Sequence, residues 1–343
     1  MLGAKYLFSE SLGHVAAVEL AAGVDASNGH EVAFERLQRT AASTDSALHF
    51  RDRVRAFAAV REPGLLEIHD HFEHAGAFYV VSEPAPGESL ASRLAREPVA
   101  VDQLLTWLAE AMRAVSALHG AGLVHGAVCP AAIFLARTEL GAERARVAPL
   151  VLAGLCASGR ADDQRLCYGS MEALAGTVDL DARADVYAFG AIAYQALAGR
   201  SPFDADATKA SSTLLRIMTE APVPLGRVRT DLPDELSALI DLTLAKRREQ
   251  RLSSLDGLRA LLEPWIEVLR RRTQPPRTRP PNAASQPATE NAPCDEQQAP
   301  SDAEPQSARL SGAVRADAVA ARAGAGHSGA GPQLHVRTED AAG

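Results

Sequence analysis

The sequence predicts an α+β protein with two lobes, a small strand-rich lobe and a larger helical lobe, followed by a disordered tail. Residues 1 to about 82 contain short apolar runs separated by turn residues, which is typical of strands and hairpins. After Gly87 the apolar residues recur at helical spacing, and after Arg272 the aromatic residues disappear. We therefore expect three regions, 1–85, 86–272 and 273–343.

The first lobe is expected to contain two strands, one helix and a hairpin, in that order. The turn sequence Asp25-Ala26-Ser27-Asn28-Gly29 joins the first two strands, and His74-Ala75-Gly76 forms the turn of the hairpin. The predicted strands are residues 12–20, 31–37, 65–72 and 77–82, and the predicted helix is 46–61.

The second lobe is expected to be built from helices. Residues 101–120 carry apolar side chains along one stripe, whereas residues 184–199 are apolar nearly all round, which indicates a central buried helix. Two further amphipathic helices are predicted at 232–245 and 254–269.

The tail differs from both lobes in composition. From Thr273 onward it has no aromatic residue and holds nine of the 20 prolines. Such a segment buries too little apolar area to offset its chain entropy, so we expect it to be disordered. Its Pro-Pro-Arg-Thr-Arg-Pro-Pro stretch could dock on a module that binds polyproline helices, but a plain linker is the simpler interpretation.

The overall charge and the cysteines exclude several classes of protein. Thirty-five basic and 43 acidic residues give a net charge of −8, which argues against nucleic acid as a partner. No apolar stretch reaches the roughly 18 residues that span a bilayer, and Met1-Leu2-Gly3-Ala4-Lys5-Tyr6 has no secretory pattern. The four cysteines, Cys129, Cys156, Cys167 and Cys294, show no paired spacing, so a reduced, cytoplasmic protein with no membrane partner is expected.

Several stretches, in order, resemble one known family. His125-Gly126-Ala127-Val128-Cys129-Pro130-Ala131-Ala132-Ile133-Phe134-Leu135 resembles the catalytic loop H-R-D-L-K-P-x-N-I-L-L of bacterial serine/threonine protein kinases. Glu31–Leu37 resembles that family's third strand, and Glu83 with Gly87-Glu88-Ser89-Leu90 resembles its hinge. Asp185–Gly190 resembles its central helix. The likeness covers about residues 6 to 265 and implies the two-lobed protein-kinase-like fold.

The resemblance implies phosphoryl transfer, which needs phosphate-binding and metal-binding groups at fixed positions. Most of these positions hold other residue types here. Gly13 is the one glycine left in the phosphate loop, at 12–18, and an ordinary β-hairpin is the better interpretation of this segment. The positions of the phosphate-binding lysine, the catalytic aspartate, the lysine two residues later, the metal-binding asparagine and the metal-binding aspartate hold Glu35, Ala127, Cys129, Ala132 and Leu152. Since residues 103–161 contain no Asp or Asn, a shift of register does not restore them.

The family pairs its strand lysine with a helix glutamate, and the matching helix position here is Arg53. Both charges are thereby reversed. The sequence leaves two interpretations of equal weight: an inverted Glu35–Arg53 ion pair that docks the helix on the strand, or two separately solvated side chains.

Other family positions are kept, and the resemblance gives them structural roles. It implies that His125 is buried beneath the loop, that Asp185 caps the backbone of the loop, and that Glu172 and Arg251 form an ion pair behind the activation segment.

Because the structural positions are kept while the phosphate-binding and metal-binding positions are replaced, we expect a degenerate member of the family, a pseudokinase that is not an enzyme. It would bind no metal or cofactor, ATP with Mg²⁺ included, and would regulate or scaffold a protein partner, such as an active kinase. The alternative is a weak or divergent serine/threonine kinase, or another nucleotide-dependent transferase, for which Asp162 and Asp163 are the best remaining carboxylates.

Two further clusters carry weaker hypotheses. His69 and His71 share a strand face, with His74 close by, a spacing that suits zinc, although surface histidines are the simpler interpretation. Cys129 and Cys156 could meet near the cleft, but neither has a His or Asp neighbour to activate a thiol.

Overall fold

The computed structural model describes residues 5–15, 17–42, 49–153, 167–175, 180–203 and 210–273. By its contacts the chain divides into two units, residues 1–278 and 279–343. The tail that was predicted to be disordered lies outside the described residues, except for Thr273 at its start.

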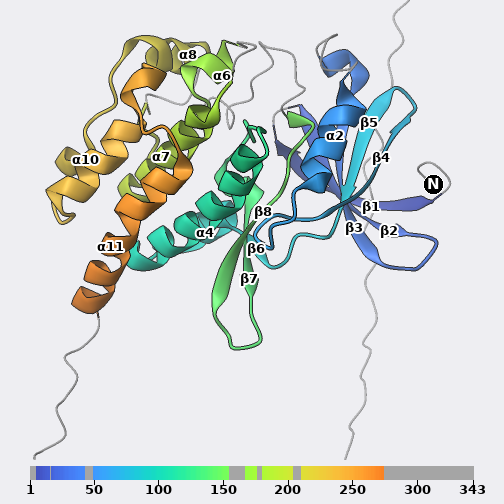
Figure 1. The fold of residues 1–343 in the computed structure, drawn as a ribbon, viewed down its shortest axis with the longest axis horizontal. Helices are drawn as coiled ribbons and strands as arrows, with labels where there is room; N and C mark the ends of the chain where they lie inside the picture. Colours follow the sequence, from blue (N-terminus) through green and yellow to red (C-terminus); the bar gives the residue numbers. More distant parts are fainter. Residues whose placement is uncertain are drawn as a thin grey trace, which may run out of the picture. The chain divides into compact units, whose positions relative to one another are not determined.

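The N-lobe is a five-stranded antiparallel sheet with one helix (Figure 1). The strand order is β1-β2-β3-β5-β4, and the strands are β1 (Tyr6–Val15), β2 (Val18–Asp25), β3 (Glu31–Gln38), β4 (Ile68–His74) and β5 (Ala77–Ser82). The helix α2 (Phe50–Ala59) buries Phe50, Val54 and Phe57, which recur at helical spacing. The ring of Phe50 packs on Phe78 of β5, with 4.6 Å between centroids.

The predicted strand at 12–20 is wrong in one respect. The structure divides this region between two strands, because β1 pairs with β2 as a hairpin in which Gly13 faces Leu20 and Val15 faces Val18. Most of β1 is exposed and carries no alternation of apolar and polar residues, so periodicity alone did not show it.

The C-lobe is helical, with a small sheet at its junction with the N-lobe (Figure 1). Its three-stranded sheet consists of β6 (Glu88–Ser89), β7 (Ile133–Arg137) and β8 (Glu143–Val147). The helices are α3 (Leu90–Arg96), α4 (Val101–Gly120), α6 (Met171–Leu174), α7 (Ala182–Ala198), α8 (Ala210–Thr219), α9 (Leu225–Val228), α10 (Asp234–Thr243) and α11 (Leu255–Thr273). The predicted end of the last helix at 269 is too early, since α11 continues past Pro264 to Thr273.

Helix α7 is the centre of this lobe, as its apolar composition predicted. The Asp181 side chain caps its start by accepting from the Arg183 N–H, and Gly199 ends it in the left-handed conformation, with φ +70°. Gly190 permits the close approach of α10, because a Cβ there would overlap the Thr243 hydroxyl. The main core extends from Val15 and Leu37 in the N-lobe to α11.

Within the described residues, no helix is long and apolar enough to cross a membrane.

Candidate functional site

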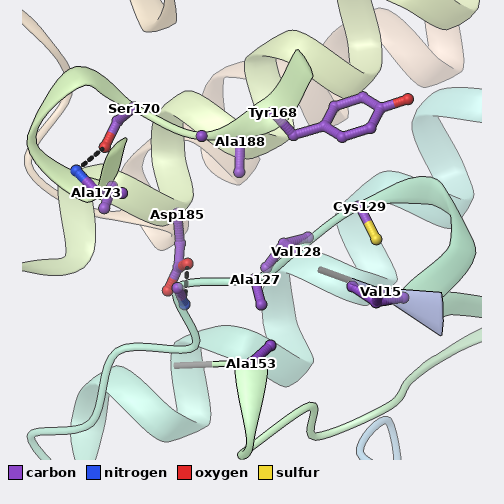
Figure 2. A pocket seen from close by; sticks show the side chains of 13 residues that line it. Val15, Ala127, Val128, Cys129, Ala153, Tyr168, Ser170, Ala173, Asp185 and Ala188 are labelled. Atoms are coloured by element: carbon purple, nitrogen blue, oxygen red, sulfur yellow. Dashed lines mark hydrogen bonds between the residues drawn. The ribbon is translucent and has the colours of Figure 1, made fainter. Parts of the chain in front are cut away.

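A cavity lies where the loop that resembles the catalytic loop meets α7 (Figure 2). The space between its walls is about 460 Å³, which includes open solvent, and the centres of water-sized molecules can reach only about 30 Å³ of it. Its walls come from the end of β1, the loop at 126–129, the residue after Leu152, the segment at 168–173 and the first turns of α7. Thirteen residues line it: Val15, Gly126, Ala127, Val128, Cys129, Ala153, Tyr168, Gly169, Ser170, Ala173, Ala184, Asp185 and Ala188. The small apolar side chains among them leave the cavity with little polar surface.

Asp185 is the one carboxylate among the described residues that line the cavity. It is 1% exposed and accepts hydrogen bonds from the backbone N–H of His125 at 3.0 Å and of Gly126 at 2.8 Å. The Nε2 of His119, on α4, donates to the same carboxylate at 2.8 Å. Asp185 is therefore engaged by the loop and by α4, which is the capping position that the resemblance implied.

His125 is fully buried beneath this loop. Its Nε2 donates to the carbonyl of Ala148 at 2.9 Å, and its Nδ1 accepts from the N–H of Ala127 at 3.3 Å. This arrangement requires a neutral ring. Burial, which outweighs the nearby charge of Asp185, lowers the pKa of His125.

Four other positions at which the family has catalytic or metal-binding groups carry no carboxylate or amide here. They are Ala127, Cys129, Ala132 and Leu152. Ala127 and Cys129 line the cavity, and Cys129 is buried. Ala132 and Leu152 are buried in the core. Across the described residues, no group of three or more His, Cys, Asp or Glu side chains could hold a metal ion. Mg²⁺ prefers oxygen ligands, and the one carboxylate among the described residues that line the cavity is the engaged Asp185.

Glu35 lies on β3, where Leu20 of β2 and Val80 of β5 are its cross-strand partners. It is 4% exposed, and its Oε2 accepts the backbone N–H of Leu152 at 2.9 Å. Its Oε1 has no hydrogen-bond partner in the described structure. Burial raises the pKa of Glu35 to about 7, although the N–H groups at 150–152 and the charge of Arg53 oppose the rise.

The ion pair considered for Glu35 and Arg53 is not formed as a contact. No guanidinium nitrogen of Arg53 lies within 4.0 Å of a carboxylate oxygen of Glu35. The Nη2 of Arg53 donates instead to the carbonyl of Val124 at 3.3 Å, and its guanidinium lies 4.9 Å from the centroid of Phe57. Burial lowers the pKa of Arg53, while Asp185 and Glu35 raise it, so the two side chains are coupled through space. The reason is geometric: each side chain finds a backbone partner nearer than the opposite charge.

Glu172 and Arg251 form a buried ion pair in the C-lobe. Nη1 of Arg251 contacts Oε1 of Glu172 at 2.5 Å, and Nη2 contacts Oε2 at 3.2 Å. The same guanidinium donates to the carbonyls of Arg183, Ala245 and Lys246. This cluster fixes α6 to α7 and to the segment before α11.

The phosphate-loop position is part of the β1–β2 hairpin. Gly13 has φ +127° with open space around it, whereas Val15 is 5% exposed and lines the cavity. Val15 lines the same cavity as Val128 and Cys129, all three of which are labelled in Figure 2.

Sequence reasoning gave no role to His119, Tyr168, Ser170 or Ala188. Tyr168, Ser170 and Ala188 line the cavity, and His119 holds Asp185. The position of His119 at the end of an apolar helix, just before the loop, was the one available signal. Nothing in the sequence pattern distinguished Ala188 from the other alanines of α7.

The remaining candidates lie elsewhere or outside the described residues. His69, His71 and His74 lie on β4, where the His71 ring packs edge-on against Phe50, and burial lowers the pKa of His71. Cys156, Cys294, Asp162 and Asp163 fall in parts of the chain that are not described.

Comparisons with known proteins agree on one family. The model of the protein kinase domain matches residues 6–266. Serine/threonine-protein kinase PknA of Mycobacterium tuberculosis is 31% identical over 245 residues, which cover 67% of this chain and 54% of PknA. Serine/threonine-protein kinase pkn2 of Myxococcus xanthus is 28% identical over 240 residues, 68% of this chain and 29% of pkn2. The chain thus matches between about a third and a half of the length of these curated relatives.

A solved structure shares the fold. The crystal structure of the Mycobacterium tuberculosis PknI kinase domain aligns with a TM-score of 0.61 and 22% sequence identity, covering 77% of this chain and 97% of that one. The two-lobed fold predicted from the sequence is confirmed.

The comparisons contradict the expectation that the chain is not an enzyme. The family model fits the whole two-lobed region, and the matched relatives are serine/threonine-protein kinases by name. That expectation was drawn from a few side chains in the cleft, whereas the match extends over both lobes. The comparisons point to a kinase.

Proposed function

The chain belongs to the protein kinase domain family, and we propose that it regulates or scaffolds another protein, such as an active kinase, in phosphorylation-based signalling. The observation that carries the proposal is the orientation of the buried polar groups. Asp185 and Glu35 both direct their carboxylates at backbone N–H groups of this chain.

The chemistry of the cavity supports a protein partner. Ala127, Val128 and Ala153 give its wall an apolar character, and Tyr168 adds an aromatic ring. Apolar pockets with few polar groups favour apolar ligand groups, such as the side chains that dominate the centres of protein interfaces. A cytoplasmic setting, in which the cysteines stay reduced, fits this role.

Transfer of a phosphoryl group to serine or threonine is a second function, which the names of the relatives favour. Such a reaction needs oxygen ligands for Mg²⁺ and a base near the acceptor hydroxyl. In this chain Ala127 and Leu152 occupy the positions where the family has these groups. The carboxylates would have to come from elsewhere, and Asp162 and Asp163 are the candidates, outside the described residues.

A binding assay tests the regulatory role. A partner is captured on the full chain, purified, and its Kd is measured against the wild type, Ala127→Phe and Ala95→Phe. Ala127 lines the cavity, while Ala95 is exposed on α3 and serves as the control. We expect Ala127→Phe to weaken binding by at least about tenfold, which is 1.4 kcal/mol, and Ala95→Phe to bind like the wild type. Equal affinities for all three proteins would contradict the proposal.

An activity assay separates the second function. The purified chain is incubated with labelled ATP, Mg²⁺ and a protein substrate, and the same is done with Asp162→Ala and Asp163→Ala. Labelled phosphate that depends on either aspartate would establish the transfer and identify its ligands. Thermal unfolding with ATP and Mg²⁺ gives an independent measure, because a ligand at about 100 times its Kd stabilises a protein by about 2.7 kcal/mol.

A further inference from the structure

We propose that Glu35 is a proton-dependent latch, which ties strand β3 of the N-lobe to residues 150–153 at the wall of the cavity. One of its oxygens holds the Leu152 N–H at 2.9 Å, and the other is buried without a partner in the described structure. The proposal concerns a conformational device within the chain and holds whichever of the two functions is correct.

The latch joins segments that are far apart in the sequence. Glu35 and Leu152 are separated by 117 residues, and β3 and residues 150–153 belong to different lobes. Ala153, the next residue, lines the cavity, as does Val15 from the N-lobe. A change at Glu35 therefore acts on the wall of the cavity through one peptide unit.

The surroundings of Glu35 decide how it responds to protons. In the sheet its cross-strand partners, Leu20 and Val80, are apolar. On α2, Arg53 is the charged group that acts on it, and Asp185 of α7 lies within electrostatic reach of Arg53. His125 is buried, and the charge of Arg53 also acts on it.

A charged Glu35 is poorly compensated in these surroundings. A buried carboxylate oxygen without a donor retains most of its desolvation cost, and Arg53 contributes only through space. Protonation removes that charge and leaves Oε2 available to accept from Leu152. The pKa of Glu35, raised by burial to about 7, agrees with this picture.

The backbone of residues 150–153 supplies a second reason for a latch. Leu150 has φ +39°, a left-handed conformation that a leucine adopts only under constraint. The Ala153 N–H donates to the carbonyl of Leu150 at 3.1 Å, closing a tight turn. Release of the Leu152 N–H by Glu35 would allow this turn to relax.

Linkage predicts the size of the effect. Burial raises the pKa of Glu35 to about 7 in the closed state, whereas the ordinary pKa of a solvated glutamate is 4.5. The closed state thus binds more protons between these two values, and the equilibrium constant for opening rises by about tenfold between pH 6 and pH 8.

Hydrogen exchange at the Leu152 amide tests this directly. The full-length chain is labelled with ¹⁵N, exchange is followed by NMR at pH 6 and pH 8, and each rate is divided by its intrinsic rate. We expect the opening constant of the wild type to rise about tenfold. Glu35→Gln, which keeps an acceptor without a titrating proton, should change less than twofold. Glu31→Gln, an exposed position on the same strand, should behave like the wild type.

Three results would overturn the latch: an opening constant of the wild type that is the same at both pH values, a pH dependence that persists in Glu35→Gln, or its loss in Glu31→Gln. If Glu35→Gln does not fold, Glu35→Met takes its place, and a pH dependence that persists in Glu35→Met would overturn the latch in the same way.

Discussion

Two buried charges, Arg251 in the C-lobe and Glu35 at the junction of the lobes, are treated differently by the fold. They are similarly buried, at 6% and 4% exposure. Arg251 has a carboxylate in bidentate contact and three backbone carbonyls. Glu35 accepts one backbone hydrogen bond, from Leu152, and its other oxygen has no hydrogen-bond partner in the described structure.

The difference appears in the pKa values of the two carboxyl groups. Burial raises the pKa of Glu172, but the hydrogen bonds and charge of Arg251 outweigh it, so that its pKa is lowered overall. At Glu35 burial dominates and the pKa rises. Burial alone therefore does not decide whether a charge is retained; the number and charge of its partners do. The partners in the C-lobe cluster favour the charged form of Glu172, whereas burial at the lobe junction favours the protonated form of Glu35.

The largest expected effect comes from removing one partner of the C-lobe pair. Arg251→Met leaves Glu172 buried without its cation, which typically costs about 3–5 kcal/mol. Urea unfolding of the full chain measures the loss. The double variant Arg251→Met with Glu172→Leu should recover part of it, because no uncompensated charge remains. A loss below about 1 kcal/mol for the single variant would mean that the buried pair contributes no more than an exposed one.

A somewhat smaller effect is expected at Asp185. Asp185→Asn replaces a charged acceptor of three hydrogen bonds with a neutral group, which costs about 2–3 kcal/mol. Asp52→Asn, at an exposed carboxylate of α2, is the control and should cost under about 1 kcal/mol. Equal losses for the two variants would mean that Asp185 does not hold the loop.

At Glu35 the free energy of unfolding is expected to depend on pH, and the wild-type side chain itself is expected to lower stability at neutral pH. Because the folded pKa is raised above the value of 4.5 in the free group, the folded state binds more protons between pH 4.5 and 7. The contribution of Glu35 to stability is present below pH 4.5 and is lost as the pH rises to 7, by up to about 3 kcal/mol.

Glu35→Gln should not show this loss. Urea unfolding from pH 4 to pH 8 gives the difference in unfolding free energy between wild type and variant. This difference separates the contribution of Glu35 from those of the other titrating groups. A difference that is constant over this range would show that the pKa of Glu35 is the same in the folded and unfolded states, and would contradict the raised pKa.

The smallest effect is expected at an exposed pair. Arg271 lies 2.8 Å from Glu267 within α11, with 76% of its side chain exposed. Arg271→Ala should change stability by at most about 0.5 kcal/mol, measured under the same conditions. A loss of 2 kcal/mol or more would mean that partner number and burial do not separate these sites.

Much of the fold could be predicted from periodicity and turn residues. The long apolar stripe of α4 and the apolar surface of α7 are strong signals, and both helices lie where they were expected. The hairpin interpretation of residues 12–18 agrees with the pairing of β1 and β2, but the start of β1 at Tyr6 was missed because β1 is mostly exposed and lacks a regular pattern.

The site was predictable where a motif placed residues in one register. His125, Asp185, Glu172 and Arg251 lie in motif positions, and their contacts follow from the fold that the motifs imply. The partner of Glu35 was not predictable, because it is a backbone N–H, which carries no residue identity. The charge reversal at Glu35 and Arg53 left an ion pair and two separately solvated side chains equally open, whereas the structure gives each side chain a backbone partner.

The most direct test of the account is the titration of Glu35 itself. Carbon-13 NMR of the glutamate side-chain carboxyl groups in the full chain, with the signal assigned by its absence in Glu35→Gln, follows this proton alone. The account predicts a midpoint near 7 for Glu35. A midpoint at or below 4.5 would contradict it, since the carboxylate would then be well compensated and no latch could work by protonation.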